Sequence, residues 1–292
     1  MKHAYLIIAH KVDLMLITLL KMLDDKRNDI YLHMDKKNKT FTQSSLPNMR
    51  YSNLFLTDRI SVNWGGYSQI KCEMLLFKTA ALNGPYVYYH LLSGQDLPIK
   101  TQNIIQDYFN NNNGKEFIRF QQPSFDNFDR VCYYHFFQEL RGRGDKRTLM
   151  SIIEGISLAI QRRLGIQRNK NIIFYKGTNW ASVTNDFVME LLRHESWIKN
   201  TFRYTSCCDE VYKQTFAMQY GFAEKLFDRN FDDNCTAIQR LIDWKRGNPY
   251  IWTKDDMEEI ASSKMMFARK FDEKKDKEII FFVERQYHKS SY

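Results

Sequence analysis

An acidic pair in the last third of the chain is the first candidate for catalysis. Asp209 and Glu210 follow two cysteines and open a predicted helix over residues 209–220. A carboxylate there can serve as a general base when a hydroxyl group comes within hydrogen-bond reach. Acidic residues are also common in the first turn of a helix, where they offset the helix dipole. The pattern alone leaves both roles open for Glu210.

A pair of cations near the C-terminus is the second candidate. Arg269 and Lys270 stand between the apolar residues Phe267 and Phe271. In an extended segment the two side chains point to opposite sides, so that one enters a site while the other meets solvent or a carboxylate. A lysine at the edge of a site can neutralise a departing diphosphate. An ordinary surface pair is the alternative interpretation.

Polar residues also follow three predicted strands. His10 follows an apolar run at residues 4–9, Asp35 follows a run at residues 29–33, and Asp96 lies in the turn after residues 86–92. Ligands of open α/β sheets bind at the carboxyl ends of the strands. For Asp96 two interpretations stay open, because it could form the floor of a sugar site or only satisfy backbone donors of the turn.

The elements that must position these residues alternate between strands and helices. Short apolar runs predict buried strands, and apolar residues at helical spacing predict the helices between them. The strand–helix–strand opening indicates a right-handed βαβ unit. The expected strands are residues 4–9, 29–33, 52–56, 86–92, 116–120 and 172–175, and the expected helices are residues 12–23, 67–82, 101–110, 149–164, one capped by Thr184 and 209–220.

This alternation predicts one α/β domain over residues 1–292. Residues 1–122 are expected to form a nucleotide-binding half. Residues 123–170 are rich in aromatic side chains and are expected to be an insertion or cap. Residues 171–292 are expected to form an acceptor and catalytic half that is mostly helical.

Common nucleotide-binding signatures are missing from the sequence. It contains no Asp-x-Asp, no P-loop string and no Gly-x-Gly-x-x-Gly. Many nucleotide-sugar enzymes use Asp-x-Asp to hold a divalent ion on the diphosphate, because hard cations prefer carboxylate oxygens. We therefore expect no metal cofactor, with side-chain cations in the place of the ion.

The charge of the chain favours an anionic partner. Its 292 residues carry a net charge of +9, and residues 141–147 are rich in arginine. A nucleic-acid or anionic-membrane binding module without catalysis is therefore the alternative function. Five cysteines without a Cys-x-x-Cys pair favour a reducing compartment. Since no apolar run approaches about 20 residues, we expect a cytoplasmic protein, held peripherally at the inner face of the membrane by charge.

Six strings together resemble the core-2/I-branching β-1,6-N-acetylglucosaminyltransferase family, which also contains peptide O-xylosyltransferases. Each string alone is only weakly specific for the family. Together they occur in the order expected for the family along residues 4–272, which makes a chance match unlikely. The strings are AYLIIAHK at residues 4–11, HMD at 33–35, LSGQDLPIKT at 92–101, GTNW at 177–180, DE at 209–210 and FARKFD at 267–272.

The resemblance implies a GT-A-type fold, that is, an α/β fold whose mixed, mostly parallel central sheet is flanked by helices, with a helical C-terminal part. It implies metal-independent, inverting transfer of GlcNAc or xylose from a UDP-sugar to a carbohydrate hydroxyl. The expected acceptor is an oligosaccharide or a lipid-linked saccharide in surface polysaccharide synthesis, and nucleic acid is not expected as a partner. A nucleotide-sugar hydrolase or a retaining transferase on a similar fold is the alternative enzyme.

The resemblance also assigns roles to residues. It implies Glu210 as the general base and Lys270 as the contact to the donor diphosphate. The family usually has a second phosphate-binding Arg, and Tyr250 stands in its place here, so that Arg246, Lys245 and Lys254 are candidates to replace it. The residues expected to bind the donor are Ala9, His10, Lys11, His33, Asp35, Trp64, Asp96, Arg246 and Lys270.

Three residues are expected to bind the acceptor, because aromatic faces and charged side chains bind sugars well. They are Asp129, Tyr133 and Trp180. For Tyr133, packing inside the cap is an equally good interpretation.

Overall fold

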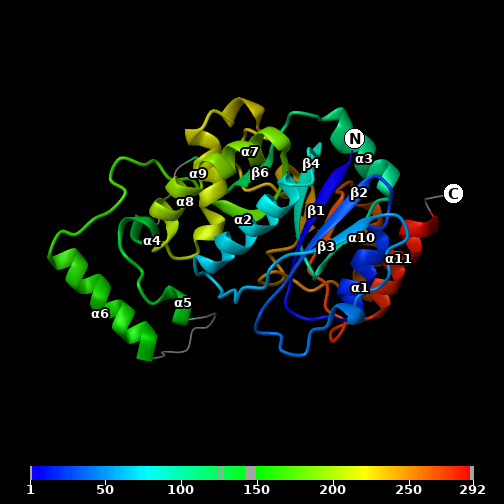
Figure 1. The fold of residues 1–292 in the computed structure, drawn as a ribbon, viewed down its shortest axis with the longest axis horizontal. Coiled ribbons are helices and arrows are strands. Elements are labelled where there is room, and N and C mark those ends of the chain that lie inside the picture. Colours follow the sequence, from blue (N-terminus) through cyan, green and yellow to red (C-terminus); the bar gives the residue numbers. More distant parts are fainter. Residues whose placement is uncertain (1, 124, 126–127, 142–148, 290–292) are drawn as a thin grey trace.

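One six-stranded sheet forms the centre of the protein (Figure 1), as seen in a computed structural model that describes residues 2–123, 125, 128–141 and 149–289. The strand order is β3-β2-β1-β4-β7-β6. The first four strands in this order are parallel, whereas β7 is antiparallel to both of its neighbours. The strands are β1 (His3–Ala9), β2 (Asn28–Met34), β3 (Asn53–Leu56), β4 (Tyr88–Ser93), β6 (Phe117–Phe120) and β7 (Gly177–Thr184). The expected α/β fold with a mixed, mostly parallel sheet is confirmed.

The central strand β1 sends its side chains into two separate hydrophobic cores. Ala4 and Leu6 belong to one core, whereas Tyr5, Ile7 and Ala9 belong to the core on the opposite face of the sheet. Successive side chains of a strand point to opposite faces, so a strand covered on both faces needs apolar residues at every position. This explains why the first apolar run of the sequence is continuous.

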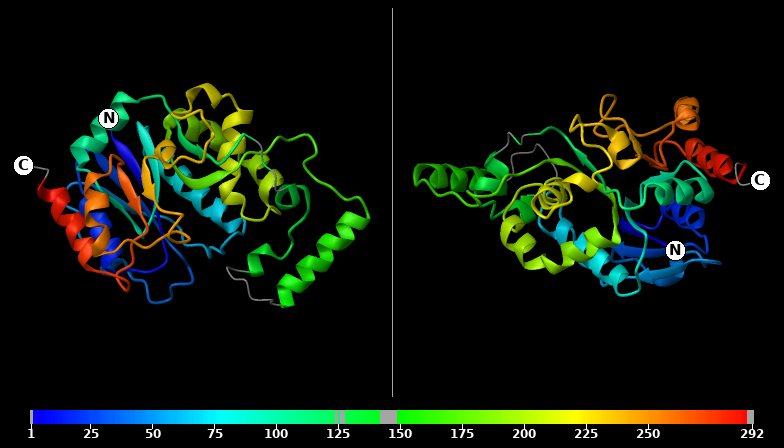
Figure 2. Two further views of the ribbon diagram at one scale, coloured as in Figure 1. Left: turned by 180° about the vertical axis from the view of Figure 1, so that it is seen from behind. Right: turned by 90° about the horizontal axis from the view of Figure 1, so that it is seen from above.

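Helices cover both faces of the sheet (Figure 2). On one face α2 packs on β1 and β2 and contacts α7, and on the other α1 contacts α11. The predicted caps Thr101 and Thr184 are confirmed, because their side chains accept hydrogen bonds from the backbone N–H groups of Ile104 and Phe187. The helices around the sheet are α1 (Leu14–Met22), α2 (Ser68–Ala81), α3 (Gln102–Asn111), α7 (Asn185–Arg193), α8 (Glu195–Phe202), α9 (Tyr212–Gln219) and α11 (Glu278–Lys289).

A small second sheet brings the end of the chain next to the end of β4. It has the order β5-β9-β8, with bounds Asp96–Pro98, Phe267–Arg269 and Arg240–Ile242. β5 and β9 are antiparallel, and Asp96 lies opposite Arg269. The helix α10 (Met257–Ser262) precedes β9. The two polar strings at residues 92–101 and 267–272 are therefore neighbours in space.

The strand expected at residues 172–175 is wrong. These residues are described as irregular chain, and the strand of this region begins at Gly177. The backbone N–H of Tyr175 donates to the Thr215 hydroxyl at 3.1 Å instead of joining a neighbouring strand. The true strand mixes small and polar residues, a pattern that does not predict a strand by periodicity.

Three helices form a separate group at one end of the molecule, away from the sheet (Figures 1 and 2). They are α4 (Phe128–Cys132), α5 (Gln138–Arg141) and α6 (Leu149–Arg163). The helix expected at residues 149–164 is confirmed. The arginine-rich segment of the sequence lies mostly at residues 142–148, outside the described residues.

Candidate active site

A cleft of about 600 Å³ opens at the carboxyl ends of β1 and β4. Ile8 and His10 line it from the end of β1, and Ser93 and Gln95 line it from the end of β4. This is the edge of an open α/β sheet where ligands bind. Among the residues predicted for the site, the cleft brings together His10, Trp64, Trp180, Glu210 and Lys270.

Glu210 presents its carboxylate to the cleft beside two cations. Its side chain is 35% exposed. Arg130 of α4 donates to it at 3.1 Å, and the ammonium of Lys176 lies 4.0 Å from the same oxygen. Ion pairs of partly exposed side chains are weak, typically worth less than about 1 kcal/mol. A hydroxyl group of a bound molecule can therefore compete for this carboxylate.

A tight turn fixes the place of Glu210. Cys207 has a left-handed backbone (φ 47°, ψ 50°), and its N–H donates to the carbonyl of Gly65 at 2.8 Å. Gly65 itself has a positive φ of 72°. A short 3-10 turn, Cys208–Glu210, follows, and the α-helix begins only at Tyr212. The prediction of one helix over residues 209–220 is therefore wrong at its start, because a turn anchored to a distant loop presents the carboxylate.

Asp209, the residue before Glu210 in this turn, is buried. The Gln69 amide donates to its carboxylate at 2.9 Å. Burial, and then the charge of Glu210, raise the pKa of Asp209 to about 8. Below that pH Asp209 holds its proton, which removes a second negative charge from beside Glu210.

A buried ion pair lies beneath the cleft. Glu73 of α2 accepts hydrogen bonds from Tyr212 and Lys213, and the Glu73 and Lys213 side chains are at most 1% exposed. Burial raises the pKa of Glu73. Glu73 and Asp209 both reach the lining of the cleft from below. We call these four residues, Glu73, Asp209, Tyr212 and Lys213, the polar floor.

The two cations of β9 and its end both line the cleft. Arg269 donates to Asp96 at 2.8 Å and to the Ser93 hydroxyl at 2.6 Å, and its guanidinium lies 4.3 Å from the ring centroid of Trp180. Arg269 meets a carboxylate, as expected for one of the two cations, and both residues line the same cleft. β9 ends at Arg269, so strand alternation does not extend to Lys270.

Lys270 also lies near the end of β1. Burial and then the charge of Lys11 lower the pKa of His10, and Lys270 acts in the same direction. Asp96, buried at 1% exposure, also accepts from the Ser93 N–H. Asp96 therefore holds Arg269 and the turn after β4 in place, which is the simpler of its two expected roles.

Trp180 lines the cleft from β7, a strand that begins at Gly177 and packs closely against β6. A Cβ atom at Gly177 would lie 1.8 Å from the carbonyl oxygen of Arg119 and 2.6 Å from the Gln214 amide nitrogen. Only glycine allows this close approach of β7 to β6. The GTNW string thus combines a packing requirement at Gly177 with a cleft residue at Trp180.

Four predicted donor residues lie at the strand ends but outside the described residues that line the cleft. Ala9 is buried, and Lys11 pairs with Asp13. His33 is fully buried and its Nε2 accepts from the Ile60 N–H at 3.1 Å. Asp35 accepts from the Lys37 N–H at 2.8 Å, which closes the turn after β2. These contacts shape the edge of the sheet next to the cleft.

Arg246 is engaged away from the cleft. It pairs with Asp243, Asp256 and Glu259, and its guanidinium lies 4.4 Å from the ring centroid of Tyr250. The structure therefore does not bring this side chain to the other predicted donor residues. Trp244, two residues earlier, lines the cleft instead and is 42% exposed.

Two predicted acceptor residues belong to the α4–α6 group. Asp129 pairs with Arg162 of α6, and the Tyr133 ring centroid lies 5.5 Å from the same guanidinium. Both lie outside the described residues that line the cleft. Arg130, which belongs to the same candidate segment for acceptor binding, does reach the cleft. Arg119 and Lys176 also line the cleft and were not predicted.

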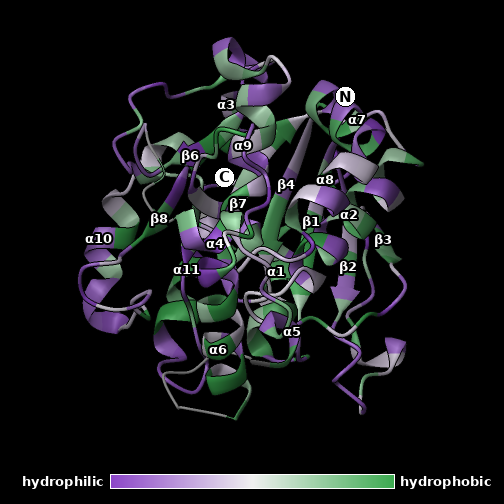
Figure 3. Cartoon of the chain, turned by 90° about the vertical axis from the view of Figure 1, so that its left-hand side faces the viewer, coloured by the Kyte–Doolittle hydropathy of each residue, from purple (hydrophilic) through white to green (hydrophobic). Residues whose placement is uncertain are grey.

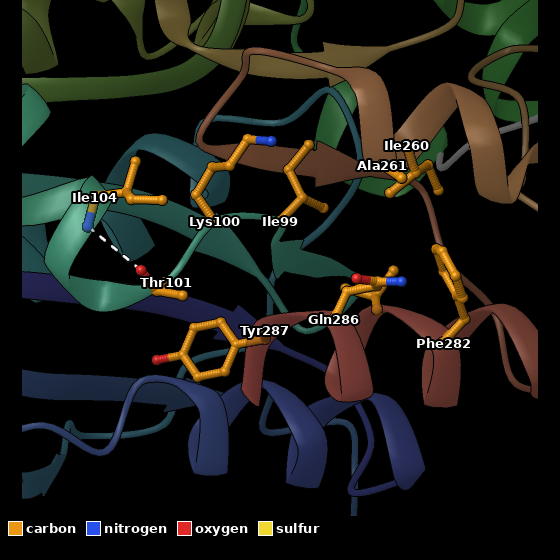
Figure 4. Close-up of a pocket in the computed structure, with 10 residues that line it drawn as sticks. Ile99, Lys100, Thr101, Ile104, Ile260, Ala261, Phe282, Gln286 and Tyr287 are labelled. Atoms are coloured by element: carbon orange, nitrogen blue, oxygen red, sulfur yellow. Dashed lines mark hydrogen bonds between the residues drawn. The ribbon is translucent and has the colours of Figure 1, made fainter. Parts of the chain in front are cut away.

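A second, smaller cavity of about 130 Å³ lies at the start of α3, against α10 and α11 (Figure 4). Lys100, Ile104 and Phe282 contribute to its lining. Burial lowers the pKa of Lys100. Among the described residues, none of those predicted for the site lines this smaller cavity.

The cleft lies at the strand ends, where enzymes with an open α/β sheet bind their ligands. The family model described as Core-2/I-Branching enzyme matches residues 3–266. The chain belongs to this family, so it is a glycosyltransferase, consistent with dependence on a UDP-sugar, and it acts on a nucleotide-sugar donor and a carbohydrate acceptor. The alternative of a binding module without catalysis is thereby set aside.

Relatives with known names transfer GlcNAc or xylose. The human N-acetyllactosaminide beta-1,6-N-acetylglucosaminyl-transferase is 23% identical over 288 residues, covering 92% of this chain and 68% of that protein. The Xylosyltransferase sqv-6 of Caenorhabditis briggsae is 21% identical over 280 residues, covering 88% of this chain and 33% of that protein. Mouse Xyloside xylosyltransferase 1, solved in its apo form, aligns with a TM-score of 0.42 at 13% identity, covering 91% of this chain and 96% of that one.

The described part of the chain offers neither a metal-ligand cluster nor a membrane-spanning helix. Within the described ranges, no three His, Cys, Asp or Glu side chains are grouped as ligands of a metal ion would be. In the same part of the chain, no helix combines the length and the apolar character needed to cross a bilayer.

Proposed function

We propose that the protein is an inverting glycosyltransferase that works without a metal ion, with Glu210 as its general base and Lys270 as the cation at the leaving diphosphate. One observation supports this proposal most. Glu210, Trp180 and Lys270 come from segments far apart in the sequence and line one cleft at the strand ends. Lys270 is the candidate to meet a phosphate because it lines the cleft and lies near His10 at the end of β1.

In the proposed reaction, Glu210 accepts the proton of the acceptor hydroxyl while the hydroxyl oxygen attacks the anomeric carbon of the sugar. The bond from this carbon to the diphosphate oxygen breaks on the opposite face, so that the configuration inverts and UDP leaves with the electron pair. The transition state is oxocarbenium-like, as in glycoside hydrolysis. Negative charge grows on the diphosphate, so Lys270 stabilises the transition state more than the ground state.

For the donor we propose UDP-GlcNAc or UDP-xylose, after the names of the relatives. Trp64 and Trp244 line the cleft and are 47% and 42% exposed, so each offers a flat face for stacking against a base or sugar ring. His10, at the end of β1, is proposed to meet the uridine. The proposed acceptor is an oligosaccharide or lipid-linked saccharide in surface polysaccharide synthesis, used at the inner face of the membrane.

The proposal is tested by incubating the purified protein with a panel of UDP-sugars and saccharide acceptors, with and without EDTA. We expect transfer from UDP-GlcNAc or UDP-xylose at an unchanged rate in EDTA, and a β-linked product from the α-linked donor in the NMR spectrum. A product of retained configuration would contradict the inverting mechanism, and loss of transfer in EDTA would contradict metal independence.

A further inference from the structure

The helix α6 exposes a continuous apolar face. Its exposed apolar residues recur at spacings of three and four, which places them on one side of a helix. They are Leu149, Ile152, Ile156, Ile160 and, just beyond the last turn, Leu164, each between 50% and 68% exposed. We call these five residues the α6 apolar face. Exposed apolar patches of this kind mark interaction surfaces in soluble proteins.

The opposite side of α6 is polar and faces the protein. The Glu154 carboxylate pairs with His135 at 2.8 Å, and the Gln161 amide bonds to the backbone N–H and carbonyl of Tyr134 at 2.8 and 3.0 Å. Glu154 and Gln161 are at most 4% exposed. An ordinary surface helix buries its apolar side and exposes its polar side. In α6 this order is reversed, so its apolar face needs another partner. Figure 3 shows the mixed hydropathy of this helix.

The sequence around α6 carries most of the net positive charge of the chain. Residues 141–170 contain eight Lys or Arg and two Asp or Glu, a surplus of six out of the net charge of +9. The basic residues stand before and after the helix, and among the described ones Arg162, Arg163 and Lys170 are exposed. An apolar helix face flanked by basic residues is the pattern of helices that lie in the interface of anionic membranes.

We propose that α6 docks the enzyme on an anionic lipid bilayer, with the α6 apolar face inserted among the headgroups and the exposed cations Arg162, Arg163 and Lys170 on the lipid phosphates. The polar side of α6 stays bound to the protein through Glu154 and Gln161. Insertion therefore needs no unfolding of the α4–α6 group.

This docking deepens the proposed function, and its relation to a lipid-linked acceptor rests on that function. Arg162 of α6 pairs with Asp129 of α4, and the next residue, Arg130, donates to Glu210. The rim of the cleft nearest to the catalytic carboxylate is thus the rim attached to α6. A saccharide on a lipid in the same bilayer would reach Glu210 from this side.

The test is flotation of the full-length protein with lipid vesicles. One set contains roughly one third phosphatidylglycerol in phosphatidylcholine, to mimic an anionic leaflet, and the other only phosphatidylcholine. The test variant is the triple change Ile152→Ser, Ile156→Ser and Ile160→Ser. The control is Leu82→Ser, Ile104→Ser and Met189→Ser, three exposed apolar residues outside α6. We expect the wild type and the control to float with anionic vesicles, and the test variant to bind at least about tenfold more weakly.

Three results would overturn the docking. They are flotation of the test variant equal to that of wild type, equal flotation of wild type with neutral vesicles, and a dimer in solution that the test variant loses while no protein floats. The last result would assign the α6 apolar face to a second copy of the chain. UDP binding, measured as a thermal shift on the same preparations, is expected to be equal in all three proteins. Absent UDP binding together with intact flotation would contradict the proposed function and leave the docking standing.

Discussion

Two acid–base pairs, one in the polar floor and one in the cleft above it, differ in their access to water. Glu73 and Lys213 are at most 1% exposed and bonded to each other within the protein. Glu210 and Arg130 are 35% and 24% exposed and meet at the edge of the cleft. The first pair can only hold α2 and α9 together, whereas the second can open to a substrate.

The difference shows how one protein keeps a carboxylate that a ligand can reach next to carboxylates that are buried. A buried charge must keep its partner, because breaking a buried pair leaves an uncompensated charge. A partly exposed pair costs little to separate. Removing a side chain from the floor should therefore change stability, and removing one from the cleft should change turnover.

The largest expected effect is on turnover, from Glu210→Gln. We expect the rate of transfer to fall by about 10²–10⁴-fold, because a positioned general base contributes about that much. The melting temperature should stay close to that of wild type. The control is Glu224→Gln, which alters another Glu–Arg pair whose carboxylate is 77% exposed. Near-normal transfer by Glu210→Gln would remove this residue from the mechanism.

The next effect is on stability, from Lys213→Met. We expect the free energy of unfolding to fall by about 3–5 kcal/mol, because Glu73 is left buried without its cation. Arg130→Met breaks the exposed pair and should cost less than about 1 kcal/mol. Both values follow from urea denaturation monitored by circular dichroism. If both variants lost the same free energy of unfolding, the buried pair of the polar floor would be no more important for stability than the exposed pair of the cleft.

The third effect is on turnover, from Lys270→Met in the part of the cleft proposed to bind the donor. We expect the rate of transfer to fall by about 10²–10³-fold, as for the loss of one preformed group that stabilises transition-state charge. The fold should be unaffected, as judged by the melting temperature. Lys264→Met, an exposed lysine just before β9, serves as the control and should transfer normally. If the rate of transfer fell in both variants, the effect would come from a disturbed β9 and not from the loss of the Lys270 charge.

The smallest expected effect is a pH dependence that Asp209 imposes on stability. Burial raises its pKa from 3.8 to about 8, so the folded protein keeps a proton that the unfolded chain loses between these values. The free energy of unfolding then falls as the pH rises through this window. Asp209→Asn should abolish that fall, whereas the exposed Asp58→Asn should keep it. Thermal melts at pH 5 and pH 8 measure the difference, and parallel curves for wild type and Asp209→Asn would refute it.

The sequence was sufficient for those parts of the fold that depend on local pattern. β1 is apolar from Ala4 to Ala9 because both of its faces are buried. Thr101 and Thr184 accept hydrogen bonds from N–H groups three residues away. β7 could not be found in this way. Its buried residue Ser182 bonds to His90 and Arg240, partners that lie far away along the chain.

The sequence could indicate residues of the candidate cleft where a side chain lies at a strand end or a turn, as for His10, Glu210 and Lys270. It was not predictable where a contact joins distant segments. Glu73 and Lys213 are 140 residues apart, and no local spacing connects them. Arg246 seemed available for phosphate because the sequence does not reveal that three nearby carboxylates engage it.

Gly177 has a consequence for attempts to change what the enzyme transfers. Any side chain at this position would collide with the Arg119 carbonyl, so a randomised library that includes it would consist mostly of misfolded members. Asn179, in the same string, lines the cleft and is only partly buried. Engineering of sugar preference should therefore keep residue 177 fixed and diversify residue 179.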